Sequence, residues 1–92
     1  MNIEEAIHYS DLYFVNYCFE KYGINRGVYN TIDRWFYEQG MDNILERRKN
    51  IILFLEYIQK DRYENKPRIK FGNGGLKIKL NNYLYPKDEM AI

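Results

Sequence analysis

Apolar side chains recur with a helical period through the first two-thirds of the chain. Their spacing predicts helices over residues 3–22, 27–39 and 43–63. Gly23 and Gly40 follow the first two segments, in the position where a glycine commonly ends a helix. The third segment carries apolar residues on two sides, a pattern typical of a helix that packs against neighbours on both. We therefore expect a three-helix N-terminal part with the third helix at its centre.

Residues 68–80 follow a different period, in which apolar and cationic side chains alternate. Four cations occupy the alternate positions: Arg68, Lys70, Lys77 and Lys79. Between the two runs lies Asn73-Gly74, and Asn-Gly is the strongest signal for a two-residue hairpin turn because both residues must take a positive φ. A turn there places the apolar side chains on one face and all four cations on the other. The pattern predicts a C-terminal β-hairpin over 68–80, with a short third strand at 83–85.

These elements predict an α+β fold in a single small domain of residues 1–92, which ends in a loose tail at 87–92. The longest unbroken apolar run is residues 51–55, far short of the roughly 20 residues that span a membrane. Cys18 is the one cysteine, so we expect no internal disulfide. The N-terminus lacks the basic start of a signal peptide. We expect a cytoplasmic protein of a bacterial host that does not contact a membrane.

Charge is distributed unevenly along the chain, although the net charge is only +1. Residues 1–46 carry eight acidic and three basic side chains, whereas residues 47–80 carry ten basic and three acidic ones. The two parts can neutralise each other inside the fold, or the basic part can face an anionic partner. The position of the four hairpin cations, against carboxylates or in open solvent, distinguishes these alternatives.

Groups suited to catalysis are sparse. His8 is the only histidine, and Cys18 lies in the same predicted helix about 15 Å along its axis, so the two cannot form a nucleophile–base pair. Cys18 shares the apolar face and is expected to be a buried thiol. His8 lies one turn from Glu4 and Asp11, a spacing more typical of a solvated charge pair than of a metal site. We predict no catalytic residue, no metal, no cofactor and no enzymatic activity.

The ten tyrosines are the most unusual feature of the composition. Tyrosine buries a large area at low entropy cost and keeps a polar tip, so it is enriched at interfaces. Tyr9, Tyr13 and Tyr17 are spaced four residues apart and form a stripe away from the main apolar face of the first predicted helix. We expect this tyrosine stripe to pack against the chain's own hairpin or tail, or to meet a partner or a second copy of the chain.

The first functional hypothesis is a small non-catalytic binding protein of phage or mobile-element type. Asn, Ile, Lys and Tyr make up 39 of the 92 residues, which indicates an A/T-rich genome such as that of a low-G+C bacterium or its phages. Such a protein would inhibit or redirect a host protein or nucleoprotein complex, for instance a nucleic-acid-handling or defence complex. Antidefence proteins such as anti-CRISPRs have this size, although no motif is shared. The partner-binding residues would be Tyr9, Tyr13, Tyr17, Arg68, Lys70, Lys77 and Lys79.

The alternative hypothesis is a DNA- or RNA-binding regulator. Three helices followed by a hairpin resemble the element order of a winged helix, in which the third helix enters the major groove and the hairpin forms the wing. The residues that contact phosphates would be Arg47, Arg48, Lys49, Arg68, Lys70, Lys77 and Lys79. The third helix is long and apolar for this role, and Asp42 and Glu46 flank its start. Binding that weakens steeply with salt would distinguish this alternative from the first.

Overall fold

Five helices make up the part of the chain that the structure describes. The computed structural model describes the backbone of residues 3–65 and 73–86, and the side chains of residues 3–60 and 75–86. The helices are α1 (Ile3–Ala6), α2 (Asp11–Tyr22), α3 (Arg26–Glu38), α4 (Ile44–Asn65) and α5 (Asn73–Leu84). No strand occurs within these two backbone ranges, so the described residues form an all-α fold.

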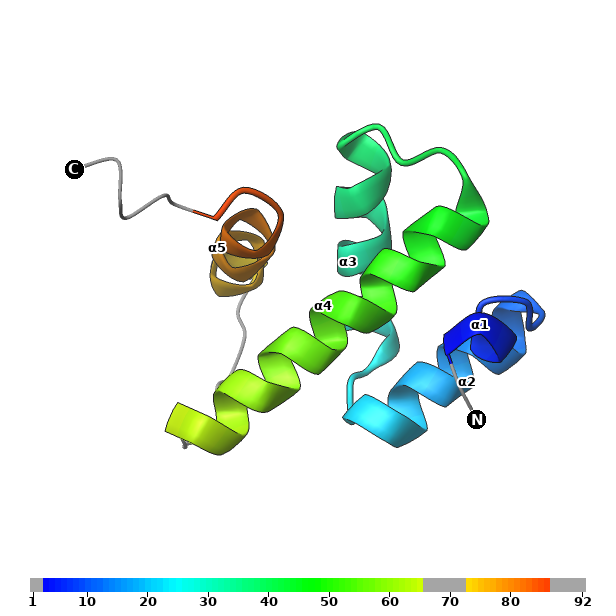
Figure 1. The fold of residues 1–92 in the computed structure, drawn as a ribbon, viewed down its shortest axis with the longest axis horizontal. Coiled ribbons are helices and arrows are strands. Elements are labelled where there is room, and N and C mark those ends of the chain that lie inside the picture. The colour runs from blue at the N-terminus through cyan, green and yellow to red at the C-terminus, as the bar shows by residue number, and fades with distance from the viewer. Residues whose placement is uncertain (1–2, 66–72, 87–92) are drawn as a thin grey trace.

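Helix α4 is the central element of the fold. It packs against each of the other four helices. In Figure 1 it crosses the molecule diagonally, with α1 and α2 on one side and α5 on the other. Ile51, Ile52 and Leu55, which lie within one broad arc of α4, are buried, whereas Leu53 and Tyr57 on the other side are 38% and 40% exposed. The prediction of a central third helix is therefore confirmed by its contacts with the other helices, although its second apolar side stays partly exposed.

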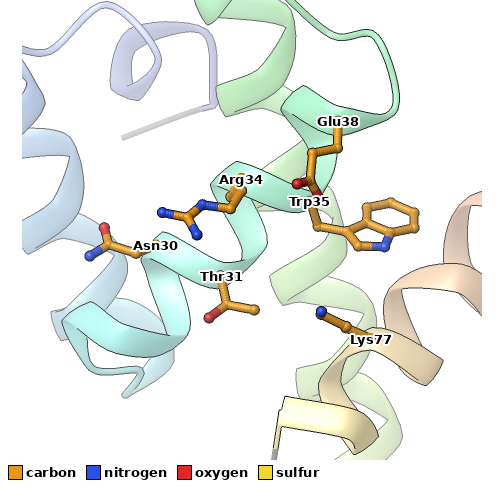
Figure 2. A pocket seen from close by; sticks show the side chains of 6 residues that line it. All are labelled: Asn30, Thr31, Arg34, Trp35, Glu38 and Lys77. Atoms are coloured by element: carbon orange, nitrogen blue, oxygen red, sulfur yellow. The ribbon is translucent and has the colours of Figure 1, made fainter.

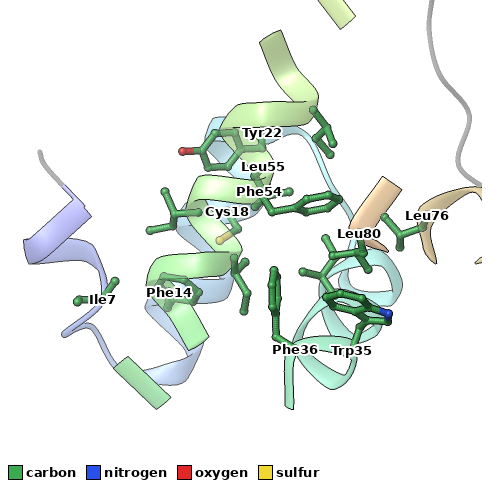
Figure 3. Close-up of a cluster of buried hydrophobic side chains, with 14 of the residues drawn as sticks. Ile7, Phe14, Cys18, Tyr22, Trp35, Phe36, Phe54, Leu55, Leu76 and Leu80 are labelled. Carbon is green, nitrogen blue, oxygen red and sulfur yellow. The ribbon is translucent and has the colours of Figure 1, made fainter. Parts of the chain in front are cut away.

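One hydrophobic core draws on all five helices. Ala6 of α1, Phe14 of α2, Phe36 of α3, Phe54 of α4 and Leu80 of α5 are fully buried and belong to the same cluster. Figure 3 shows side chains from the successive helices converging on this cluster. The core thus holds α5 against α3 and α4.

Local polar side chains and one glycine determine where the helices begin and end. The side-chain oxygen of Asn25 accepts the N–H of Val28 at 2.9 Å and caps α3. Asn43 accepts the N–H of Glu46 at 2.9 Å in the same way at the start of α4. Gly23 ends α2 with a φ of +68°, a left-handed conformation that favours glycine. Because these signals are local, the predicted bounds of α3 and α4 lie within two residues of the observed ones.

The prediction of one helix over residues 3–22 is wrong, because a turn separates α1 from α2. The hydroxyl of Ser10 accepts an N–H of the first turn of α2 and so caps a new helix. Arg48 of α4 donates hydrogen bonds to the carbonyls of Ile7 and Tyr9 in this turn. A side chain from a distant helix thus satisfies carbonyls that a continuous helix would have bonded internally.

The predicted β-hairpin is also wrong, and with it the α+β class, because residues Asn73–Leu84 form α5. Leu76 and Leu80 are buried one helical turn apart, whereas Ile78 is 62% exposed. Leucines four residues apart fit a helix as well as they fit an alternating strand. Burial of these two leucines against the core selects the helix over the alternating pattern.

The remaining C-terminal predictions divide into two groups. The third strand at 83–85 is wrong, because Leu84 is the last residue of α5. Arg68, Lys70 and the tail at 87–92 lie outside the described residues. Among the helices that the structure describes, none combines the length and the apolar character that crossing a membrane requires.

Candidate functional site

A groove runs between α3 and α5. It consists of two adjoining recesses, of about 340 Å³ and about 440 Å³, which share Trp35 and Lys77. We call it the α3–α5 groove. Its lining residues are Asn30, Thr31, Arg34, Trp35, Glu38, Lys77, Ile78, Asn81 and Asn82. Figure 2 shows the first recess, with the Lys77 side chain reaching from α5 toward α3.

The groove forms where the exposed faces of two packed helices meet. On α3, Ile32 and Phe36 point into the core, while the lining residues Asn30 and Arg34 lie one turn apart on the outer face. On α5, Leu76 and Leu80 are buried in the core, and Lys77 lies next to Leu76 and lines the groove. Most apolar side chains of the two helices lie in the core, so the side chains that line the groove are mainly polar.

Two cations of the groove are available for a ligand. Within the described part of the chain, neither Arg34 nor Lys77 takes part in an ion pair. Both side chains are exposed. Glu38 is the one carboxylate among the lining residues, so the groove carries a net positive charge. Two unpaired cations on facing helices suit an anionic ligand.

An exposed aromatic ring, that of Tyr85, follows the C-terminal end of α5 and contacts the lining residue Trp35. Tyr85 is 53% exposed, and its ring packs edge-to-face against Trp35 with 6.5 Å between the ring centroids. Its hydroxyl donates to the side-chain oxygen of Gln39 at 3.0 Å. Its backbone N–H donates to the carbonyl of Asn81 at 2.8 Å, which continues the helical geometry past the end of α5. Tyr85 is thus held in place while about half of the residue stays exposed to solvent.

Two of the three basic residues predicted to contact phosphates from the third helix, Arg47 and Arg48, form ion pairs within the fold instead. Arg47 pairs with Asp33 at 2.7 Å and donates to the carbonyl of Met41 at 2.9 Å. Arg48 is buried and pairs with Asp11. Both arginines bond groups of the acidic N-terminal half, so the charge asymmetry is resolved here by internal neutralisation.

The other predicted cations do not form one surface. Lys49 is exposed and lies 3.8 Å from a carboxylate oxygen of Glu4. Lys77 enters the α3–α5 groove, whereas Lys79 is half-buried and has a partner within the chain. Two residues apart on a helix, they point about 200° apart, so the predicted cationic face does not exist there. Arg68 and Lys70 lie outside the described residues.

The tyrosine stripe does come together, although Tyr9 lies in the turn before α2. The ring centroid of Tyr9 is 6.4 Å from that of Tyr13 and 6.3 Å from that of Tyr17. Tyr13 is 68% exposed, whereas Tyr9 and Tyr17 are half-buried. Lys21 donates to the hydroxyl of Tyr17 at 3.1 Å. Part of the stripe therefore packs within the chain, and Tyr13 presents the largest free surface.

A polar cluster links the end of α2 to α4. The hydroxyl of Tyr22 donates to a carboxylate oxygen of Glu56 at 2.5 Å, and Lys21 lies 3.6 Å from the same oxygen. Burial raises the pKa of Tyr22, and its hydrogen bond to Glu56 raises it further. The phenol therefore stays protonated and structural at neutral pH.

The structure describes both groups considered for catalysis, Cys18 and His8. Burial raises the pKa of the Cys18 thiol to about 12, which keeps it protonated and unreactive at neutral pH. His8 is exposed in the turn after α1. Within the described residues, no three His, Cys, Asp or Glu side chains gather in an arrangement that could hold a metal.

The sequence did not point to most residues of the α3–α5 groove. Asn81 and Asn82 fall between the predicted hairpin and the predicted third strand, so the sequence pattern does not place them opposite another helix. Asn30, Arg34 and Glu38 do show a four-residue spacing that marks the outer face of a helix. That spacing predicts a polar face, but it contains no information about the helix that lies opposite.

One comparison with known proteins gives a match. No family model matches the chain. No solved structure matches it either. The chain is 41% identical over 81 residues to the RNA-binding riboflavin kinase RibR of Bacillus subtilis (strain 168), a match that covers 87% of this chain. The same match covers 35% of that relative, so the chain spans about a third of its length.

Proposed function

We propose that the chain binds RNA through the α3–α5 groove. The name of the relative joins RNA binding to a kinase activity, and the chain spans only about a third of that protein. The chemistry of the groove favours the first of these two activities. The observation that carries the proposal is the presence of two cations, Arg34 and Lys77, on facing helices in a groove that also holds amide side chains; neither cation has an ion-pair partner among the described residues.

Three types of side chain in or beside the groove suit parts of RNA. Arg34 and Lys77 suit phosphates, which supply most of the affinity of a protein for nucleic acid. Asn30, Asn81 and Asn82 offer amides, each with donors and an acceptor, and base edges present both kinds of group. Tyr85 offers an open ring on which a base can stack.

The side chains of the same groove support phosphoryl transfer less well than RNA binding. That chemistry depends on carboxylates or similar ligands that hold magnesium against the phosphates, together with a positioned catalytic base. The α3–α5 groove supplies a single carboxylate, Glu38. We therefore propose a non-catalytic role for this chain, with the groove used for binding.

The hypothesis of a phage or mobile-element inhibitor stays a prediction, since neither the comparisons nor the fold address it. Its candidate contact is Tyr13, which is exposed and packs against Tyr9. The winged-helix form of the nucleic-acid hypothesis is not retained, because the wing is absent from residues 73–80. Binding through α3 and α5 replaces it.

The proposal is tested by the fluorescence anisotropy of labelled RNA, with hairpins and single strands as probes, between 50 and 200 mM salt. We expect Arg34→Gln and Lys77→Gln each to weaken binding and to reduce the slope of log K against log salt by about 0.7 to 0.9. Arg26→Gln is the matched control, because Arg26 is exposed on α3 and lies outside the groove. Circular dichroism confirms that each variant is folded.

Two results would contradict the proposal. One is the absence of binding to every RNA probe at 50 mM salt, where electrostatic attraction is strongest. The other is binding that the double substitution Arg34→Gln/Lys77→Gln leaves unchanged. In the second case RNA would bind, but the α3–α5 groove would not be the site.

A further inference from the structure

Lys77, Asn81 and Tyr85 stand in a row along one face of α5. They are four residues apart, so each is one turn, or about 6 Å, from the next. The backbone bond from Tyr85 to the carbonyl of Asn81 keeps Tyr85 in this row beyond the end of the helix. A cation, an amide and an aromatic ring therefore follow one another along this row, and these groups suit a phosphate, a base edge and a base face in turn.

We infer that the α3–α5 groove holds an unpaired nucleotide of RNA, with its base stacked on Tyr85, its edge bonded by Asn81 or Asn82, and its phosphate near Lys77. This inference rests on the proposed RNA-binding function and names the part of an RNA that the groove takes. It assigns Tyr85 and the two asparagines roles that the cations alone would not require.

Tyr85 is prepared for stacking. Its hydroxyl is held by Gln39 and its ring packs against that of Trp35, so little side-chain freedom remains to be lost when a base binds. Trp35 itself is only 9% exposed and cannot offer its face. Among the lining and adjacent rings, Tyr85 therefore provides the platform for the base.

The amides of Asn81 and Asn82 are free to bond a base. Both side chains are exposed, and neither has a hydrogen bond within the described part of the chain. An amide offers donors and an acceptor side by side, which matches the adjacent acceptor and donor on the edge of an unpaired base. An unpaired base keeps this edge available, whereas Watson–Crick pairing occupies it.

Helical RNA cannot make the same contacts. The bases of an A-form duplex lie in a deep, narrow major groove that side chains cannot read. A duplex could place its phosphates near Arg34 and Lys77 at the rim, but it could not project a base onto Tyr85. A loop or a single strand can extend a base into the recess, as sequence-specific RNA recognition commonly requires.

The test compares two labelled probes by anisotropy at one salt concentration: a ten-nucleotide mixed-sequence RNA strand and the blunt duplex that it forms with its complement. We expect the strand to bind about tenfold or more tightly than the duplex, since each stacked base contributes about five- to 150-fold in affinity. Tyr85→Ala should lose about fivefold or more on the strand, with no change on the duplex or in the salt slope. Tyr85→Trp should retain binding.

Tyr13→Ala is the matched control, because Tyr13 is exposed on α2 and away from the groove. Equal affinity for strand and duplex, or a Tyr85→Ala variant that binds the strand as the parent chain does, would overturn the inference while RNA binding itself stood. Failure of both probes to bind at low salt would overturn the proposed function and the inference together.

Discussion

The guanidinium of Arg48 is paired with the carboxylate of Asp11, and this ion pair joins α4 to the first turn of α2. The two partners differ in environment, since the side chain of Arg48 is 6% exposed and that of Asp11 is 86% exposed. Arg48 also bonds the carbonyls of Ile7 and Tyr9, and its guanidinium lies 4.9 Å from the ring centroid of Phe14. One buried cation thus holds the turn between α1 and α2 in place.

This asymmetry predicts unequal effects of substitution. Arg48→Met leaves two carbonyls without their donor and should lower the free energy of unfolding by roughly 2–4 kcal/mol. Asp11→Asn should lower it by less than about 1 kcal/mol, because an exposed partner is screened by solvent. Urea unfolding followed by circular dichroism measures both. Equal losses for the two variants would contradict a structural role centred on Arg48.

A substitution at Gly75 distinguishes α5 from the predicted hairpin. Gly75 is exposed within the helix, and a Cβ atom added there meets no atom within 4 Å. Gly75→Ala should therefore raise the free energy of unfolding by about 0.5–1 kcal/mol, since alanine favours a helix over glycine by that amount. Urea unfolding gives the change, with the helical signal at 222 nm as a control. A lower stability would contradict a helix at this position.

The buried thiol of Cys18 predicts a loss of stability at high pH. Its pKa of about 12 in the fold exceeds the value near 9 of a free thiol. The unfolded chain therefore releases this proton first, and stability is complete below about pH 9 and falls as pH rises toward 12, by up to about 1.4 kcal/mol per pH unit. Burial also raises the pKa of Tyr22 and Tyr29, which adds to the loss.

Urea unfolding at pH 8, 9.5 and 10.5 measures this dependence, and Cys18→Ala should make it shallower. The native thiol should also resist alkylation at pH 8 and react at once in urea, because only the thiolate is nucleophilic. Equal alkylation rates in the native and unfolded chain would contradict the burial of Cys18.

Local signals predicted much of the helical structure. Gly23, which follows the first predicted helix, ends α2 through its own conformation, and the apolar period predicted α3 and α4. The buried apolar side of α4 follows from its own period. Such features depend on short stretches of sequence, and the predicted bounds of α3 and α4 lie within two residues of the observed ones.

The features that the sequence pattern did not predict depend on contacts between residues far apart in the chain. The break before Ser10 depends on Arg48, 38 residues further along the chain. The choice between a strand and a helix at Leu76 and Leu80 depends on the core that these leucines bury against. The α3–α5 groove joins Arg34 to Lys77, which no local pattern connects. Pairing of the helices in space therefore determined the turn, the C-terminal helix and the candidate site.

The most direct test of RNA binding through the α3–α5 groove is a titration of the ¹⁵N-labelled chain with an unlabelled ten-nucleotide RNA strand, followed by NMR. We predict that the largest shift changes fall on residues 30–38 and 77–85, and on the indole N–H of Trp35, the one tryptophan of the chain. The amide of Arg26 should move little. Largest changes at Tyr9, Tyr13 and Tyr17, or no change at all, would contradict the proposed site.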